Sequence, residues 1–367
     1  MILVDDAATA LQSVDGRPFL AHLASEAARF GFTSILALAA SGAAPVRDAL
    51  AQSGLDLSIE VLVDEVLAGD PPAGGAGALW RARDRLDERF FVLDGDSWFD
   101  FNWLSLLTAE GADAAIATVA RRRDDGREAP AGVALVSREI VAHLAPSGSL
   151  ARDVFPRLAQ AGALSSVAAS GRFVDVAAPG GLALARAHVA GWRKRPAVFL
   201  DRDGTLNEDS GYVYRSADFR WLPGAIEGVR RLNDAGVYVF VVTNQSGVAR
   251  GLYNEGDVKA LHAWVQRQLR EEGAHIDDFR YCPSHPDGPV EAYRRRDTWR
   301  KPEPGMLIDL ADHWPIDMSR SVMIGDKDID VEAGRGAGVE SVKIGPEGIL
   351  PAIDDAIARV RDAGGAG

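Results

Sequence analysis

Cysteine is almost missing from this chain. Cys282 is the single cysteine among 367 residues, so no intrachain disulfide can form, and a reducing cytoplasm is the expected compartment. Long apolar runs are missing as well. None reaches about 18 residues, so no transmembrane helix is expected. Residues 1–10 lack the basic start and the long apolar core of a secretory signal, so none is expected.

Positive charge is also in short supply. The chain carries 40 Lys and Arg residues against 53 Asp and Glu residues, a net charge of −13. An acidic surface disfavours nucleic acids and anionic membranes as partners. A small anionic substrate stays compatible with this charge, provided that a local cation or metal ion binds it.

The length is enough for about two domains. A helical pattern over residues 182–192 ends in Arg193-Lys194-Arg195, followed by Pro196. Cationic residues in a last turn followed by proline are typical of a helix end. We therefore place the boundary here and expect domains at residues 1–192 and 193–367.

Short apolar runs alternate with helical patterns in both halves, which favours an α/β fold. In the second half the runs lie at residues 197–200, 237–242, 321–324 and 341–344. Continuous apolar strands separated by helices predict a parallel sheet covered on both faces. Ligands of such sheets bind beyond the carboxyl ends of the strands. Asp201, Thr243 and Asp326 follow three of these runs and should therefore share one edge.

The residue types at that edge fit phosphoryl transfer. Asp201 and Asp203 are two positions apart, so one carboxylate can attack phosphorus while the other protonates the leaving oxygen and later activates water. Lys301 offers a positive charge for phosphate. Asp326, with Asp330 one helical turn further on, offers carboxylates for a hard divalent ion, and Mg²⁺ fits because it needs few of them.

Four segments resemble, in order, the four motifs of the haloacid dehalogenase (HAD) superfamily of phosphatases. They are residues 201–205 (DRDGT), 242–245 (VTNQ), 300–302 (RKP) and 325–327 (GDK). The resemblance implies that the second half is a HAD-like domain without a large cap. We expect two Rossmann-like three-layer domains in the whole chain, of which this is the C-terminal one. Short loops would then determine its substrate specificity.

The finer resemblance is to heptose bisphosphate phosphatases and covers nearly all of residues 197–350. It depends on residues 203–207 (DGTLN), 211–213 (GYV), 243–251 (TNQSGVARG), 281–283 (YCP) and 300–307 (RKPEPGML). Members of that family remove the 7-phosphate from D-glycero-D-manno-heptose 1,7-bisphosphate. Histidinol phosphatases are close relatives, so histidinol phosphate or another sugar phosphate is the alternative substrate.

The resemblance also implies roles for individual residues. Asp201 would be the nucleophile and Asp203 the general acid/base. Mg²⁺ would be held by Asp201, the Asp203 carbonyl and Asp326, with the backbone of Lys327 near. The residues expected to contact a phosphorylated sugar are Arg202, Asp209, Ser210, Gly211, Tyr212, Thr243, Asn244, Gln245, Ser246, Arg300 and Lys301.

One departure from the family concerns metal. Relatives often hold a structural zinc with a Cys-x-His pair and a later Cys-x-Cys pair. Here Cys282 is followed by Ser284 and His285, and the later pair is replaced by residues 297–299 (DTW). A closed zinc site needs four nitrogen or sulfur ligands. We therefore expect no zinc, and we expect Trp299 to fill the space by packing.

The first half resembles sugar-1-phosphate nucleotidyltransferases, in particular the heptose 1-phosphate guanylyltransferase type. The similar segments are residues 16–20, 29–32, 74–79, 93–97, 153–156 and 175–179. Asp96 and Asp175 match positions where that family holds Mg²⁺. The glycine-rich triphosphate loop is missing, however, and Asp5 and Asp6 stand in its place, where they would repel phosphate.

These departures favour a nucleotidyltransferase-like domain that is catalytically silent. It would still be able to bind a nucleotide, a nucleotide-sugar or a sugar phosphate, or to mediate assembly. Two alternatives stay open: a bifunctional protein whose first half binds or transfers a nucleotide, and a start codon that lies upstream of Met1.

The remaining aromatic residues have structural interpretations. Trp192, Trp221 and Trp264 are expected to pack, whereas His262 and His313 are expected on helix surfaces.

Overall fold

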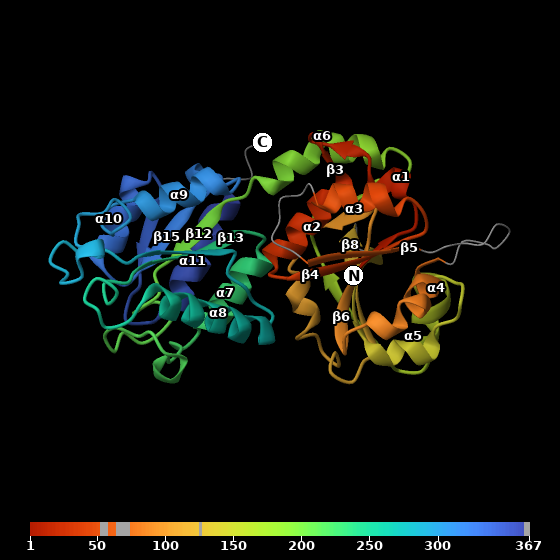
Figure 1. Cartoon of the computed structure of the whole chain (residues 1–367), viewed down its shortest axis with the longest axis horizontal. Helices are drawn as coiled ribbons and strands as arrows, with labels where there is room; N and C mark the ends of the chain where they lie inside the picture. The colour runs from red at the N-terminus through yellow and green to blue at the C-terminus, as the bar shows by residue number, and fades with distance from the viewer. Residues whose placement is uncertain (52–57, 64–73, 125–126, 363–367) are drawn as a thin grey trace. The chain divides into compact units, whose positions relative to one another are not determined.

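The computed structural model describes residues 1–51, 58–63, 74–124 and 127–362. The chain divides into two compact units, Met1–Trp192 and Arg193–Gly367, called unit 1 and unit 2 below (Figure 1). Within the described ranges, no helix has the length and apolar character to cross a membrane.

Unit 2 is built on a five-stranded parallel sheet with the strand order β14-β13-β12-β15-β16. The four apolar runs of the sequence form four of these strands, with ends that differ by a residue or two, so the expected parallel sheet is confirmed. The fifth strand, β14, was not predicted. The strands are β12 (Ala197–Leu200), β13 (Tyr238–Asn244), β14 (Asp278–Cys282), β15 (Val322–Gly325) and β16 (Glu340–Lys343).

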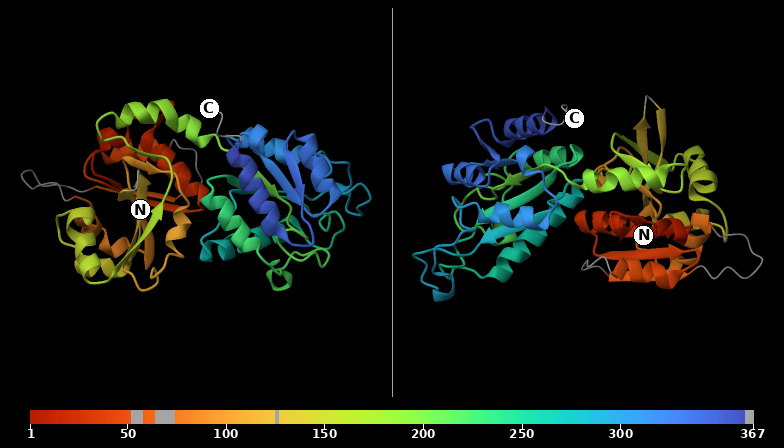
Figure 2. Two further views of the ribbon diagram at one scale, coloured as in Figure 1. Left: turned by 180° about the vertical axis from the view of Figure 1, so that it is seen from behind. Right: turned by 90° about the horizontal axis from the view of Figure 1, so that it is seen from above.

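Helices cover both faces of this sheet because successive strand residues point to opposite sides. Val198 and Leu200 pack into one core with residues of α7, α8 and α11, whereas Phe199 packs into a second core with α9. Figure 1 shows α9 on one side of the strands with α7 and α8 on the other, and Figure 2 shows α11, in dark blue, lying across the sheet. The helices are α7 (Ala225–Asp234), α8 (Glu255–Glu271), α9 (Gly305–His313), α10 (Asp328–Gly336) and α11 (Ile349–Asp362).

The connections that follow β12 and β13 are loops rather than domains. Residues 201–224 contain one 3-10 turn, at Ser216–Asp218, and residues 245–254 lead directly into α8. Asn254 starts that helix with a capping box, in which its side chain accepts from the Asp257 amide and the Asp257 carboxylate accepts from the Asn254 amide. The described part of unit 2 therefore has no inserted cap domain, and these loops surround the carboxyl edge of the sheet.

Unit 1 has a seven-stranded mixed sheet with the order β10-β8-β9-β6-β1-β4-β5, in which β9 is antiparallel to its neighbours β6 and β8. The strands are β1 (Ile2–Val4), β4 (Ser34–Ala39), β5 (Ser58–Val63), β6 (Arg89–Asp94), β8 (Ala117–Asp124), β9 (Arg127–Ser137) and β10 (Leu164–Ala169). Shorter elements are α1 (Ala7–Ala10), the pair β2 (Ser13–Val14) and β3 (Arg17–Pro18), and the pair β7 (Ser97–Phe99) and β11 (Phe173–Asp175).

Unit 1 is layered in the same way. Ile2 and Val4 pack into a core shared with α2, α3 and α6, and Leu3 packs into the opposite core with α4 and α5. The helices are α2 (Phe19–Arg29), α3 (Ala43–Ala51), α4 (Gly74–Arg81), α5 (Phe155–Gln160) and α6 (Gly181–Arg193). The α/β class expected from the sequence is thus confirmed in both units.

Candidate active site

The three middle strands of unit 2 deliver polar residues to one edge. Asp201 directly follows β12, Thr243 and Asn244 end β13, and Asp326 directly follows β15. The strands β13, β12 and β15 are neighbours and parallel, and the Asp201 amide continues the ladder by donating to Ile324 O at 3.0 Å. Residues far apart in the sequence are therefore gathered at one place, as the sequence predicts.

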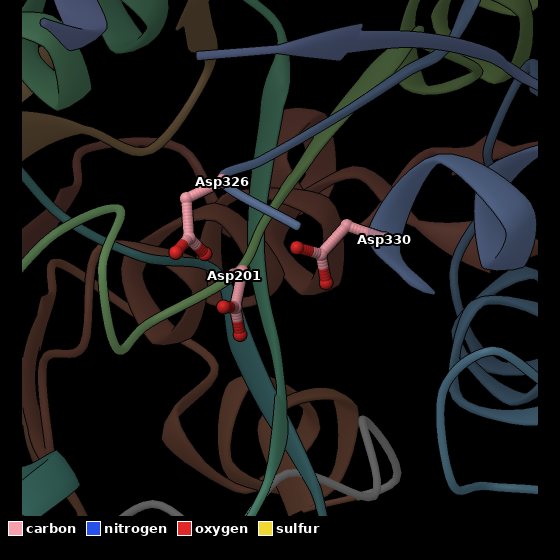
Figure 3. A group of neighbouring side chains, drawn as sticks. All are labelled: Asp201, Asp326 and Asp330. Carbon is pink, nitrogen blue, oxygen red and sulfur yellow. The ribbon is translucent and has the colours of Figure 1, made fainter. Parts of the chain in front are cut away.

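A buried lysine lies among the carboxylates at this edge. Lys301 Nζ is 2.6 Å from Asp201 Oδ1 and 2.7 Å from Asp330 Oδ1. Oxygen atoms of Asp201, Asp326 and Asp330 all lie within 4.8 Å of one another, and Figure 3 shows the Asp326 and Asp330 carboxylates pointing toward the region of Asp201. Three carboxylates with one lysine leave an excess of negative charge that suits a divalent cation.

Burial and charge shift the titration of this cluster. Burial raises the pKa of Asp201 to about 6, and Lys301 opposes that rise. Burial by itself would lower the pKa of Lys301, but Asp201 and Asp330 together raise it above its usual value. Asp201 is therefore an ionised, lysine-paired carboxylate at neutral pH, which is the state that a nucleophile requires.

Asp326 fits the role of a metal ligand. Its Oδ1 is buried and has no hydrogen-bond partner within the described ranges. A buried carboxylate oxygen without a partner is costly unless a cation binds it. Gly204 makes the close approach feasible, because it has φ +93° and a Cβ there would lie 2.4 Å from Asp326 Oδ2.

Asp203 is held by three donors. Arg202 forks onto both of its oxygens at 2.8 and 2.9 Å, Asn207 Nδ2 donates to Oδ1 at 3.0 Å, and Gln245 Nε2 donates to Oδ2 at 2.9 Å. These contacts fix the carboxylate beside Asp201. The Arg202 side chain is fully buried here and also donates to Val213 O at 2.7 Å. That side chain therefore holds Asp203 from behind and does not line the cavity described below, and the contact of Arg202 with substrate stays a prediction.

A cavity of about 320 Å³ opens over these residues. Most of the predicted site residues line it, and Tyr253 and Ile329 line it without having been predicted. Tyr253 has no pattern of its own in the sequence, whereas Ile329 follows the predicted metal residues closely. The predicted residues that line it are Asp201, Asp203, Asp209, Gly211, Tyr212, Thr243, Asn244, Gln245, Ser246, Lys301 and Lys327.

Lys327 and Asp209 join across the mouth of this cavity. Their side chains are 2.8 Å apart, and this hydrogen bond lowers the pKa of the Asp209 carboxyl. The backbone amide of Lys327 donates to Asp330 Oδ2 at 3.0 Å, which anchors the start of α10. Tyr212 lies at the rim, 46% exposed and with a positive φ of 55°.

Comparison with known proteins identifies this arrangement. Residues 298–345 match the HAD-hydrolase-like family model. A D-glycero-beta-D-manno-heptose-1,7-bisphosphate 7-phosphatase from Rhodopseudomonas palustris is 51% identical over 156 residues, which make up 42% of this chain and 87% of that protein. The chain belongs to the heptose-1,7-bisphosphate 7-phosphatase family. It is thus a phosphatase of the HAD superfamily.

Solved structures resemble both halves of this phosphatase. The D,D-heptose 1,7-bisphosphate phosphatase of B. bronchiseptica, complexed with magnesium and phosphate, has 28% identity and a TM-score of 0.37, covering 44% of this chain and 98% of that one. HddC from Yersinia pseudotuberculosis has 14% identity and a TM-score of 0.43, covering 51% of this chain and 98% of that one.

Besides Arg202, two predicted substrate residues of the phosphatase do not line the 320 Å³ cavity. Ser210 borders a separate recess beside Tyr212. Arg300 is half-buried and donates to the Ser284 carbonyl at 3.3 Å. Sequence spacing alone could not separate them from their neighbours in the same motifs.

The loop of residues 282–299 corresponds to the expected zinc-binding loop of the relatives. Hydrogen bonds to the Asp297 carboxylate connect its parts. Asp297 Oδ2 accepts from Ser284 Oγ at 2.8 Å and from Arg295 Nε at 3.1 Å, and Asp297 Oδ1 accepts from the Trp299 amide at 3.0 Å. These donors hold the pKa of Asp297 below its usual value despite burial, which raises it. Trp299 packs against the second core of unit 2, as expected.

The prediction for His262 is wrong. It is 5% exposed, stacks on Phe279 at 4.5 Å between ring centroids, and has Nε2 3.4 Å from an Arg202 guanidinium nitrogen. Burial and that guanidinium lower its pKa to about 3, so the ring is neutral. His313 is exposed, as expected, and Trp192, Trp221 and Trp264 pack against the cores as predicted.

Unit 1 of the phosphatase has an acidic cavity of its own, of about 480 Å³. It is lined by Asp5, Asp94, Asp96 and Asp175, together with apolar wall residues. Burial first, and then repulsion from the three other carboxylates, raises the pKa of Asp94 to about 6. Asp5, which the sequence predicts to repel phosphate, lines this cavity.

Proposed function

We propose that unit 2 hydrolyses the 7-phosphate of D-glycero-D-manno-heptose 1,7-bisphosphate in a Mg²⁺-dependent reaction through an aspartyl-phosphate intermediate. The observation that carries the proposal is the buried Asp201–Lys301 pair under a 320 Å³ cavity, in a chain that is 51% identical over 156 residues to a named heptose bisphosphatase. A capless site with a rim of short loops has room for a small phosphorylated sugar.

The first half-reaction follows from the placement of the side chains. Lys301 occupies Asp201 Oδ1, so Asp201 Oδ2 is left to attack phosphorus, and the bond from phosphorus to the sugar oxygen breaks. Asp203 gives its proton to that leaving oxygen. Lys301 and the amide of Asn244 stand at the cavity to offset and orient the phosphate charge.

The second half-reaction returns Asp201 to its starting state. Asp203, now ionised, removes a proton from a water molecule as the water oxygen attacks phosphorus. The bond from phosphorus to Asp201 Oδ2 then breaks, and inorganic phosphate leaves. The donors on Asp203 from Arg202, Asn207 and Gln245 keep its carboxyl group in place for this proton transfer.

The residues present fit a divalent cation. Asp201 and Asp326 would hold it with carboxylate oxygens and Asp203 with its carbonyl, and the partnerless Asp326 Oδ1 is the atom that most needs it. When bound, Mg²⁺ supplies positive charge against the phosphate oxygens.

The test is phosphate release with Mg²⁺ from both anomers of heptose 1,7-bisphosphate, with histidinol phosphate alongside. We expect a strong preference for one heptose anomer. Asp201→Asn should lower the rate by at least about 1,000-fold while the melting temperature is kept. Equal, slow release from all three compounds would refute the proposed substrate, and a substantially active Asp201→Asn would refute the mechanism.

We infer that unit 1 is catalytically silent as a nucleotidyltransferase. Four carboxylates line its cavity and repel one another, and Arg121, a cation of the same cavity, is paired with Glu128 at 3.1 Å. The full chain incubated with heptose 1-phosphate, Mg²⁺ and GTP or ATP should release no pyrophosphate. Turnover of either nucleotide would show a bifunctional protein instead.

A further inference from the structure

Tyr253 is the large cavity residue that the sequence motifs do not explain. It lies between β13 and the capping box of α8, and its ring is buried. The ring lines both the 320 Å³ cavity and an open groove next to it, and it stacks on Tyr214 with ring centroids 4.8 Å apart. The Tyr214 ring therefore supports one face of the Tyr253 ring.

Gly247 leaves the space that the Tyr253 ring occupies. A Cβ on Gly247 would lie 2.0 Å from Tyr253 Cε1 and 2.6 Å from its hydroxyl oxygen, which no real side chain tolerates. The Tyr253 ring therefore occupies space that only a glycine at position 247 leaves open.

The hydroxyl donates to Gln245. Tyr253 Oη is 2.7 Å from Gln245 Oε1, and the other end of that amide, Nε2, donates to Asp203 Oδ2 and to Thr243 Oγ1, each at 2.9 Å. The chain of donors therefore runs in one direction, from Tyr253 through Gln245 to Asp203. A reversed Gln245 amide would place its oxygen against the Asp203 carboxylate, which can only accept, so that contact sets the orientation of the amide.

We propose that Tyr253 is a positioning residue that acts through Gln245 to hold the general acid/base Asp203 in place. The inference rests on the proposed function and deepens it. Arg202 contacts both oxygens of Asp203 and Asn207 contacts Oδ1, so Gln245 is the additional donor on Oδ2. Fixing Oδ2 fixes which face of the carboxyl group meets the leaving oxygen.

Leaving-group chemistry separates this role from a general structural one. A sugar alkoxide needs a proton to leave, whereas p-nitrophenolate leaves without one. We expect Tyr253→Phe to lower kcat on the sugar phosphate by about 10-fold or more, part of the usual contribution of general acid catalysis. On p-nitrophenyl phosphate the same variant should lose less than about 3-fold. The sugar substrate is heptose 1,7-bisphosphate or, if that is not turned over, the alkyl phosphate that the wild type hydrolyses fastest.

Tyr293→Phe is the matched control. Tyr293 lines the same groove as Tyr253, and its hydroxyl donates to Glu255 at 2.7 Å. The variant loses that hydrogen bond, and within the described ranges none joins Glu255 to Gln245. Its two rates should stay within about 2-fold of the wild type. Gly247→Ala is the second variant, and it should reproduce the leaving-group dependence of Tyr253→Phe because the new Cβ displaces the ring.

Each outcome decides the proposal. The informative case is a Tyr253→Phe variant that melts like the wild type. The proposal is overturned if that variant loses activity equally on both substrates, or loses activity on neither. A wild type that hydrolyses other alkyl phosphates but not the heptose would refute the proposed substrate and leave the Tyr253 comparison intact. An Asp201→Asn variant that keeps its activity would refute the mechanism itself.

Discussion

The two units place carboxylates at the ends of parallel strands, yet they balance that charge differently. In unit 2, Lys301 bridges Asp201 and Asp330 with contacts of 2.6 and 2.7 Å. In unit 1, Asp94 lies among other carboxylates, and across the described ranges no ion pair joins it to a cation. Burial raises the pKa of both Asp94 and Asp201 to about 6. Neighbouring carboxylates add to the rise in both units, but Lys301 opposes it in unit 2 and no cation opposes it for Asp94.

This difference teaches that a fold edge does not make an active site by itself. Parallel sheets bring strand ends together in both units. Among the described residues, only unit 2 supplies a cation from a distant loop to a carboxylate at this edge, because Lys301 Nζ lies 2.6 Å from Asp201 Oδ1. Unit 1 keeps the acidic edge, but within the described ranges no ion pair joins a carboxylate of its cavity to a lysine or arginine.

Removing the lysine should give the largest effect. Lys301→Met leaves Asp201 and Asp330 buried without their cation, so unit 2 should lose about 3–5 kcal/mol of stability in urea unfolding. Phosphatase activity should fall by at least about 1,000-fold at neutral pH. The pKa of Asp201 then moves above its present value of about 6, so residual activity should shift toward higher pH.

Lys343→Met is the control for that variant. Lys343 pairs with Asp328 at 2.7 Å, but both side chains are exposed, so the expected loss is below about 1 kcal/mol with activity unchanged. If Lys343→Met destabilised the protein as much as Lys301→Met does, the distinction between buried and exposed charge balance would fail.

The loop that delivers Lys301 should give an intermediate effect. Asp297→Ala removes three hydrogen bonds, two from side chains and one from the Trp299 amide, and should cost about 1–3 kcal/mol. Activity should fall by about 3- to 30-fold because the loop shifts Lys301. Thermal melting and phosphate release measure both effects.

Asp287→Ala is the matched change on the same loop. Its side chain is 87% exposed, and it should leave melting temperature and activity unchanged. A zinc chelator should change the melting temperature of neither the wild type nor Asp287→Ala. Chelator-induced loss of stability in the wild type would contradict the hydrogen-bonded loop and indicate a metal.

The sequence alone indicates the strands of unit 2 and the residues at their ends, because continuous apolar runs and adjacent carboxylates are local signals. Asp201 and Lys301 meet as their motifs imply. It could not show that Arg202 turns inward, since a buried arginine depends on partners such as Asp203 and Val213 O that only the fold brings together.

Tyr253 and His262 mark the same limit. Tyr253 enters the cavity because Gly247, six positions earlier, lacks a side chain, and no periodicity reports such a pairing. His262 is buried on α8 because Phe279 of β14 stacks on it, although histidine is usually a surface residue on a helix.

Neutralising Asp94 should give the smallest effect, with the opposite sign. The folded-state pKa of Asp94, about 6, lies above its unfolded value of 3.8, so its ionisation destabilises unit 1. The penalty is absent when both states are protonated, grows as pH rises from about 4 to about 6, and is complete above that. Asp94→Asn should therefore stabilise unit 1 by about 0.5–1 kcal/mol at neutral pH, after allowance for solvent screening.

Differential melting of the full chain tests this last expectation. The gain in melting temperature for Asp94→Asn should be about 1–3 °C at pH 7 and should vanish near pH 4, because protonated Asp94 carries no penalty there. Asp113→Asn, at a 98% exposed carboxylate near Arg89, should leave the melting temperature unchanged at both pH values. A gain that persists at pH 4 would mean that charge repulsion is not the cause. A loss at pH 7 would mean that the Asp94 carboxylate has a cation partner, and the contrast between the units would then disappear.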